Sequence, residues 1–230
     1  MRALLLPIKD LGNAKQRLAG FLTAEERFGL ANAMLADTIR AVRGVQKADR
    51  VFVVTNYEPA MVAARDNGWE ILPEARQISE SVSVDAASRQ CEALGITAVL
   101  RLPLDLPLLQ SRDIDELLAV DCAAPAVVIV PSRDGTGTNA ILRTPPTLFP
   151  SHFGTGSLAK HCGEAERAGA QIFKRRNVRL EMDVDDEADL RALLLHDLSG
   201  TQTGAWLRTS GVAEKLQSRT VTGASVAANI

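Results

Sequence analysis

Three cations follow the first apolar segment of the chain. Residues 2–7 have the pattern of a short buried strand, and Lys9, Lys15 and Arg17 come directly after it. Lysine and arginine neutralise phosphate oxygens, and one arginine can bind two of them at once. This loop would lie at the carboxyl end of a strand, where open α/β sheets bind their ligands. The spacing therefore predicts a binding loop for a triphosphate, with a solvated basic loop as the alternative.

Carboxylates at two further places have the pattern of a metal site. Asp105 lies in the run Leu-Pro-Leu-Asp-Leu-Pro after an apolar strand, where a charge is costly to desolvate unless it is paired. Asp183 and Asp185 alternate along an extended segment, so their side chains face the same way. Mg²⁺ prefers one or two carboxylates together with phosphates. The alternatives are a turn in which Asp105 binds backbone N–H groups, and N-capping of the next helix by Asp185 or Asp186.

Two glycine-rich turns suggest a site for a small anion. Residues 134–139 (Asp-Gly-Thr-Gly-Thr-Asn) connect two strands, and residues 153–157 (Phe-Gly-Thr-Gly-Ser) open a helix. A helix N-terminus with glycines and a hydroxyl group binds anions. Neither turn matches the P-loop or the dinucleotide-binding pattern, and each alone is an ordinary turn. His152 and His161 flank the second turn without metal-ligand spacing, and His152 is a candidate for a substrate contact.

Strand and helix patterns alternate along the chain. Their order predicts an α/β fold: a single three-layer αβα domain over residues 1–198, with a mostly parallel, Rossmann-like sheet. Residues 199–230 are rich in Ser, Thr, Gly and Ala, with Trp206 and Leu207 as the main apolar anchors. This composition predicts a weakly ordered C-terminal extension, with room for a short docked segment. The predicted strands are 2–7, 50–55, 69–72, 97–102, 126–130, 140–143 and 171–174, and the predicted helices are 23–42, 58–67, 81–94, 112–120, 157–168 and 187–196.

Composition excludes several classes of protein. Of the 230 residues, 46% are hydrophobic and 23% are charged, which is typical of a soluble globular protein. The net charge of −2 argues against a nucleic-acid-binding protein, where a basic excess is expected. No apolar run is long enough for a membrane span, and the N-terminal run is too short for a signal peptide. Three scattered cysteines predict a reducing, cytoplasmic location rather than a zinc or disulfide framework.

Together, the motifs resemble those of the phospholactate or phosphoenolpyruvate guanylyltransferases of deazaflavin-coenzyme biosynthesis. The resemblance covers about residues 1–197 and implies the nucleotidyltransferase α/β fold. It implies transfer of GMP from GTP to the phosphate of a three-carbon phosphoacid, release of pyrophosphate and a requirement for Mg²⁺. The motifs that carry it are Pro-x-Lys-x-Leu-x-x-Ala-Lys-x-Arg-Leu (7–18), Asp-Leu-Pro (105–107), Gly-Thr-Asn-Ala (137–140), Phe-Gly-x-Gly-Ser (153–157) and Asp-Val-Asp (183–185).

The same resemblance implies a role for individual residues. It places catalysis on Lys15, Arg17 and Asp105. Two anionic phosphates must meet in line, so positioning and charge neutralisation dominate the chemistry and no general base is needed. The implied binding residues are Pro7, Lys9, Lys15, Arg17 and Ser83 for GTP, Thr138, Asn139, Gly154 and Ser157 for the phosphoacid, and Asp105 with Asp183 or Asp185 for Mg²⁺.

Some points stay open at the level of the sequence. Residues 81–85 stand where relatives carry a Leu-Asn pair that reads the base, so strictness for guanine is not fixed. The acceptor is 2-phospholactate, phosphoenolpyruvate or 3-phosphoglycerate. The implied partners are a downstream enzyme that transfers the product to a deazaflavin, and a second copy in a homodimer. Alternative functions are a nucleotide-sugar-dependent glycosyltransferase, which also uses an Asp-x-Asp metal site, and an inactive nucleotide-binding protein.

Overall fold

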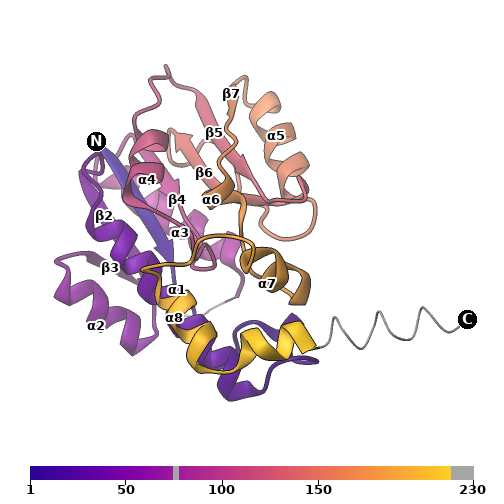
Figure 1. The fold of residues 1–230 in the computed structure, drawn as a ribbon. Coiled ribbons are helices and arrows are strands. Elements are labelled where there is room, and N and C mark those ends of the chain that lie inside the picture. The colour runs from indigo at the N-terminus through magenta and orange to yellow at the C-terminus, as the bar shows by residue number, and fades with distance from the viewer. Residues whose placement is uncertain (75–77, 219–230) are drawn as a thin grey trace, which may run out of the picture.

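Seven strands form one central sheet in the computed structural model, which describes residues 1–74 and 78–218 (Figure 1). The strand order is β3-β2-β1-β4-β6-β5-β7. Strand β6 runs antiparallel to both of its neighbours, and the other adjacent pairs are parallel. The predicted mostly parallel sheet is therefore confirmed. The strands are β1 (Arg2–Pro7), β2 (Arg50–Thr55), β3 (Glu70–Pro73), β4 (Ala98–Arg101), β5 (Ala126–Pro131), β6 (Thr138–Thr144) and β7 (Gln171–Lys174).

Helices cover both faces of the sheet because the central strands are apolar on both faces. In β1, Leu4 and Leu6 point to one layer, whereas Ala3 and Leu5 point to the other. The Leu4 face packs against α1 (Ala24–Arg43), α2 (Glu58–Asp66), α4 (Ser111–Leu118) and α6 (Val178–Glu181). The opposite face packs against α3 (Glu80–Ala93) and α5 (Ser157–Arg167). These contacts confirm the three-layer αβα architecture.

The longest helix, α1, begins where the sequence predicts a capping box. The Thr23 hydroxyl accepts a hydrogen bond from the Glu26 backbone N–H at 3.1 Å, and the Glu26 carboxylate accepts one from the Thr23 N–H at 2.7 Å. These bonds satisfy two backbone donors that a helix start leaves free. The cap fixes the point at which the chain leaves the basic loop and enters the helix.

The chain after residue 199 differs from the predicted weakly ordered extension over residues 202–218. Helix α8 (Gln202–Thr209) docks against α1, and a further helical segment covers 212–218 (Figure 1). The buried carboxylate of Asp37 accepts hydrogen bonds from the Gln202 and Thr203 backbone N–H groups at 2.8 and 2.9 Å. A charged cap supplied by another helix ties α8 down despite its polar sequence. The rest of the predicted extension, 219–230, lies outside the described residues.

Apolar side chains of this C-terminal region form a separate cluster with the basic loop and the Asp183–Asp185 segment. The cluster also includes helix α7 (Glu187–Leu193). Its members are buried, and α1 and Leu108 also contribute to it. We call it the C-terminal cluster, and its buried residues are Leu18, Phe21, Leu22, Leu30, Met34, Leu108, Met182, Val184, Leu190, Leu193, Leu207, Val212 and Leu216.

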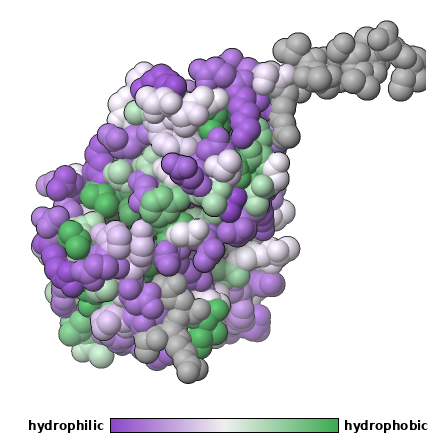
Figure 2. All heavy atoms as spheres, turned by 90° about the horizontal axis from the view of Figure 1, so that it is seen from below, coloured by the Kyte–Doolittle hydropathy of each residue, from purple (hydrophilic) through white to green (hydrophobic). Residues whose placement is uncertain are grey.

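The face seen in Figure 2 carries hydrophilic and hydrophobic side chains in small, interspersed patches. Within the part of the chain that the structure describes, no helix is both long and apolar enough to cross a lipid bilayer.

Candidate functional site

Two adjoining cavities open near the carboxyl ends of β1 and β4. The first, which we call the loop cavity, is about 300 Å³ and is lined by the basic loop from Pro7 to Lys15. The second, the turn cavity, is about 490 Å³ and is lined by both glycine-rich turns and by the Asp183–Asp185 segment. The two cavities share a wall. The residues common to both are Glu80, Arg101, Pro103 and Asp105.

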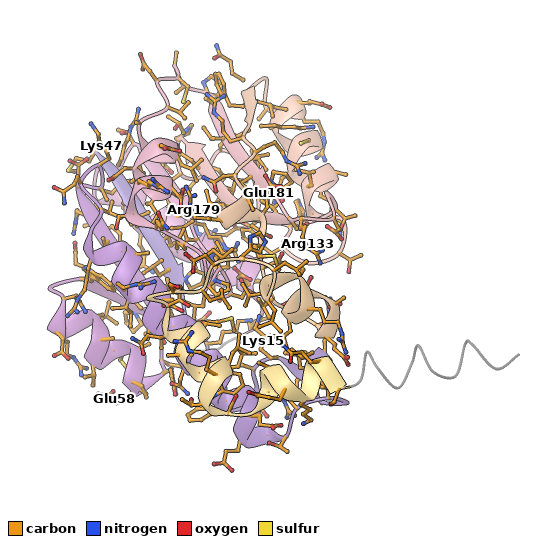
Figure 3. All side chains as sticks on the ribbon, in the orientation of Figure 1. Lys15, Lys47, Glu58, Arg133, Arg179 and Glu181 are labelled. Carbon is orange, nitrogen blue, oxygen red and sulfur yellow. The ribbon has the colours of Figure 1, made fainter. Side chains whose placement is uncertain are left out.

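Lys15 is the centre of the charged network in this wall. Its Nζ lies 2.9 Å from Asp105 Oδ2 and 3.1 Å from Asp185 Oδ1, and its side chain is only 10% exposed. Burial by itself would lower the pKa of Lys15, but the two carboxylates outweigh it and raise the pKa. Lys15 therefore carries its charge at neutral pH and joins the basic loop to the two acidic segments, next to α7 (Figure 3).

The backbone of Lys15 is held in an unusual conformation. Its φ is +55°, and it is the one non-glycine residue with a positive φ among residues 1–74 and 78–218. It sits between two 3₁₀ turns, η1 (Leu11–Asn13) and η2 (Gln16–Leu18). A left-handed conformation costs free energy in a residue with a Cβ and persists where its surroundings enforce it. Here the conformation places the ammonium group between Asp105 and Asp185.

Arg17 and Asp185 form a second ion pair at the mouth of the turn cavity. Arg17 Nη1 lies 3.2 Å from Asp185 Oδ2, and the arginine side chain is 70% exposed. The neighbouring Asp186 caps α7 by accepting the Asp189 N–H at 3.0 Å. Of the two capping residues considered from the sequence, the structure uses Asp186. Asp185 is thereby left to face the cations.

Asp183 is the third carboxylate of the turn cavity. Burial raises its pKa to about 6, and the negative charges of Asp105 and Asp185 add to the effect. The Asn139 side chain partly offsets this by a hydrogen bond to Asp183. In the part of the chain that the structure describes, no three His, Cys, Asp or Glu side chains converge closely enough to form a ready-made metal site. Asp105 and Asp185 nevertheless share Lys15, and their negative charges add to the raised pKa of Asp183. This repulsion is what a divalent cation would relieve.

The raised pKa of Asp183 has a measurable effect on stability. Because folding raises this pKa from 3.8 to about 6, the folded state holds the proton more tightly. The free energy of unfolding of the metal-free protein should therefore fall as the pH rises from about 4 to 6. The variant Asp183→Asn should lack this contribution and exceed the wild type by about 1 kcal/mol above pH 6, since Asp183 is partly exposed.

Urea denaturation of both proteins in EDTA, from pH 4 to pH 8, measures the difference. A difference that stays constant over this range would contradict the raised pKa. Asp115→Asn serves as the control because Asp115 lies outside both cavities and accepts the backbone N–H groups of Gln46 and Lys47.

The predicted acceptor residues Thr138, Asn139, Gly154 and Ser157 all line the turn cavity. The Asn139 amide is fixed from behind, because it donates to the carbonyls of Leu180 and Glu181 at 3.0 and 3.2 Å. The first turn closes tightly on itself, since a Cβ on Gly137 would lie 2.7 Å from Ser132 Oγ. The two turns meet where the Leu158 N–H donates to the Thr136 carbonyl at 3.1 Å. Gly154, with φ +108°, provides a backbone conformation that side chains disfavour. Ser157 is the first residue of α5, at the positive end of its dipole.

The predicted nucleotide-binding residues do not all lie in the same place. Pro7, Lys9 and Lys15 line the loop cavity, and Arg17 lines the turn cavity. Ser83 lines neither of the two cavities. It lies on the buried face of α3, where its hydroxyl donates to the Ser79 carbonyl at 2.8 Å and also bonds Glu74. The structure thus gives no support to the predicted nucleotide contact of Ser83, because a serine in a helix readily bonds the preceding turn instead.

Arg101 and Glu80 are site residues that were not predicted from the sequence. Arg101 ends β4, is buried, and donates to the Asn139 carbonyl at 3.1 Å. Its guanidinium lies 4.1 Å from the centre of the Phe153 ring and pairs with Glu80. A charged residue at the end of an otherwise apolar strand was the available signal, since a buried cation requires partners. This pair belongs to the wall that divides the two cavities.

The two histidines beside the second turn lie in different surroundings. His152 does not line either cavity and is bonded through Nε2 to Glu164 at 3.0 Å. His161 is fully buried behind the turn cavity and contacts Thr138. The predicted substrate contact of His152 is therefore not supported, and His161 is the histidine connected to the site.

Comparisons with known proteins agree with this geometry. The family model described as guanylyl transferase CofC like matches residues 1–227. A phosphoenolpyruvate guanylyltransferase of Conexibacter woesei is 36% identical over 215 residues, covering 92% of this chain and 95% of that protein. A 2-phospho-L-lactate guanylyltransferase of Methanothermobacter thermautotrophicus is 31% identical over 204 residues, covering 89% and 88%.

Solved structures support the fold. A candidate nucleotide-diphospho-sugar transferase from Desulfovibrio desulfuricans G20 superimposes with a TM-score of 0.73 at 16% identity, over 94% of this chain and 97% of that one. A nucleotidyl transferase from Methanothermobacter gives a TM-score of 0.59 at 13% identity, over 91% and 99%. The nucleotidyltransferase α/β fold is therefore shown for this chain.

Proposed function

Because the chain belongs to the CofC-like guanylyl transferase family, we propose that it is an enzyme that transfers GMP from GTP to the phosphate of a small phosphoacid. The acceptor class is 2-phospholactate, phosphoenolpyruvate or 3-phosphoglycerate. The observation that carries the proposal is the pair of adjoining cavities, one beside the basic loop and one beside the glycine-rich turns. Asp105 lies in the wall that they share, and Lys15 of the loop cavity is bonded to it.

The arrangement suits a reaction between two anions. We infer that the triphosphate lies along Lys9, Lys15 and Arg17, and that the phosphoacid lies against Thr138, Asn139, Gly154 and Ser157. A phosphate oxygen of the acceptor forms a bond to the α-phosphorus of GTP, and the bond to the β-phosphate breaks to release pyrophosphate. No proton needs to be removed from the acceptor, because its phosphate is already ionised at neutral pH. The cations offset the charge of the approaching groups, and the rigid turns hold the acceptor in line.

The acidic side chains fit Mg²⁺. Asp105, Asp183 and Asp185 supply the oxygen ligands that this ion prefers. Burial raises the pKa of Asp183, and the charges of the other two carboxylates add to this effect. When bound, Mg²⁺ would polarise the phosphoryl oxygens and neutralise the charge on the leaving pyrophosphate. Lys15 would then have to share Asp105 and Asp185 with the metal. Before the substrates bind, Lys15 would hold these two carboxylates in place.

The proposal extends to the pathway. The product, an anhydride of GMP and a phosphoacid, is an activated compound that requires a downstream enzyme able to move the phosphoacid to a deazaflavin. The same proposal includes the cytoplasmic location and the homodimer implied by the resemblance.

Pyrophosphate release tests the proposed reaction. The purified protein, Mg²⁺ and GTP are mixed with 2-phospholactate, phosphoenolpyruvate or 3-phosphoglycerate in separate reactions, and pyrophosphate is detected by a coupled pyrophosphatase. We expect release with at least one acid, and none when Mg²⁺ is chelated. ATP and CTP in place of GTP measure the strictness for the base.

The identity of the leaving group separates the alternatives. A glycosyltransferase would release a nucleoside diphosphate from a nucleotide sugar and no pyrophosphate. Binding of GTP without turnover on any of the three acids would contradict the proposal and favour the inactive nucleotide-binding protein.

A further inference from the structure

His161 and Thr138 form a buried contact directly behind the turn cavity. His161 lies in the second turn of α5 and is fully buried, with the rings of Phe149 and Phe153 packed around it at centroid distances of 6.1 and 5.1 Å. Thr138 is the first residue of β6, is 6% exposed, and lines the cavity. The Nδ1 atom of His161 lies 3.0 Å from the Thr138 hydroxyl oxygen.

The backbone of His152 determines which nitrogen of His161 carries the proton. The His152 N–H lies 2.9 Å from His161 Nε2 and can only donate, so Nε2 must present a lone pair. The proton of the neutral ring is therefore on Nδ1. The ring stays neutral, because burial lowers its pKa to about 3. The nearby charges of Arg143, His152 and Arg101 add to this effect, and the charge of Asp85 opposes it.

The proton on Nδ1 in turn sets the direction of the Thr138 hydroxyl. Since Nδ1–H donates to the Thr138 oxygen, the hydroxyl hydrogen has to point elsewhere. Within the described chain, no hydrogen bond takes this hydrogen up. Thr138 lines the turn cavity, so the cavity is where an acceptor for it can bind.

We propose that His161 is a positioning residue that makes Thr138 an obligatory hydrogen-bond donor to the anionic acceptor substrate. The order of donors runs from the His152 N–H to the His161 ring, from the ring to the Thr138 hydroxyl, and from the hydroxyl into the cavity. Such a donor favours a carboxylate or phosphate oxygen and disfavours a group that must itself donate. The assignment of this anion as the phosphoacid rests on the proposed function.

Two amide substitutions of His161 separate the donor from the acceptor. The side-chain nitrogen of His161→Asn corresponds in position to Nδ1, so it can still donate to Thr138 but leaves the His152 N–H without a partner. The amide of His161→Gln corresponds to Nε2, so it can still accept from His152 but no longer donates to Thr138. The two variants thus remove the two hydrogen bonds one at a time.

The kinetic readout is the KM for the phosphoacid in the pyrophosphate assay. We expect His161→Gln to raise this KM about tenfold and His161→Asn about threefold at most, with the KM for GTP unchanged in both. Thermal melting should show the opposite order, because His161→Asn is the variant with an unpaired buried N–H. In a Thr138→Val background, the difference in KM between the two variants should disappear.

The tautomer is measured independently of turnover. Nitrogen-15 NMR of the substrate-free wild type should show a protonated Nδ1 and an unprotonated Nε2 at neutral pH. A protonated Nε2, or equal KM values for the two variants, would overturn the inference. If the tautomer is as expected but no pyrophosphate is released with any of the three acids, the proposed function is overturned instead.

Discussion

Replacing Asp105 with asparagine should lower kcat for pyrophosphate release by roughly 10²–10³-fold at saturating Mg²⁺. Asp105 stands in the wall shared by both cavities and contacts Lys15 at 2.9 Å, so it lies where both substrates and the metal would meet. Asparagine has the same shape but one oxygen and no charge. It can still accept a hydrogen bond from Lys15 Nζ, but it is a poor ligand for Mg²⁺.

The fold should survive this substitution. Lys15 keeps Asp185 as a second partner at 3.1 Å, so no buried cation is left alone. The melting temperature, measured alongside kcat, distinguishes loss of chemistry from loss of structure, and Asp115→Asn provides a matched carboxamide outside both cavities. Wild-type kcat in a folded Asp105→Asn protein would rule out Asp105 as a metal ligand.

The order of elements could be predicted because most of them carry strong local patterns. The β-branched run of β2 and the short run of β7 have the predicted bounds, Arg50–Thr55 and Gln171–Lys174. The direction of β6 was harder to predict, since the apolar pattern of a buried strand is the same in a parallel and an antiparallel pair. The connection from Pro131 to Thr138 was the signal, because it is too short for a crossover helix between parallel strands. Helix α6 was missed because it has a single turn.

The charged part of the site was predictable for a different reason. Lys15 and Arg17 belong to a basic loop after the first strand, Asp105 interrupts an apolar run, and Asp185 alternates with Asp183. The structure brings Lys15, Arg17, Asp105 and Asp185 together. The sequence alone marks these residues, because a charge in an apolar run is costly unless it is paired or functional, and cations after a strand suit an anionic ligand. Their individual partners were not predictable, because the contact between Lys15 and Asp185 joins the two ends of the fold.

The partners of the buried polar residues behind the site could not be recognised in advance. Arg101 and His161 each resemble an isolated polar residue within a strand or helix pattern, and their partners come from other elements. Ser83 shows the converse, since the resemblance implied a contact with GTP, whereas its hydroxyl bonds the preceding turn of its own helix. Side-chain direction on a helix depends on a register that local sequence leaves uncertain by a residue or two.

Helix α8 was hidden by its composition. Residues 199–210 include Gly, Ser and Thr, which are poor helix formers, and tertiary contacts decide the outcome. Gly29 in α1 makes room for Trp206 of α8. A Cβ at this position would lie 2.4 Å from the indole Nε1 and would clash with the ring. Asp37 then caps the start of α8. None of these contacts can be seen in the local pattern of residues 199–210.

Leu207→Ala should lower the stability of the protein by about 2–5 kcal/mol, which corresponds to a fall of roughly 4–20 °C in melting temperature. Leu207 is 1% exposed and lies in the C-terminal cluster. Removing its side chain would leave a cavity in that cluster, where α8 packs against α1. Ending the chain at residue 200 would also remove Val212 and Leu216, a loss comparable to the whole stability of a typical domain.

The exposed neighbour Arg208 provides the control for this substitution. Arg208→Ala alters the same helix at a surface position, and we expect a change in melting temperature of about 1–2 °C at most. Equal melting temperatures for Leu207→Ala and the wild type would show that α8 does not pack as described. If the expected loss is found, the C-terminal region is part of the folded core that supports the site. Leu18 and Val184 belong to the same cluster, and they lie in the segments that carry Lys15 and Asp185. A partial loss of stability should then be accompanied by a weaker response of the melting temperature to Mg²⁺ and GTP, since both ligand-binding segments rest on that cluster.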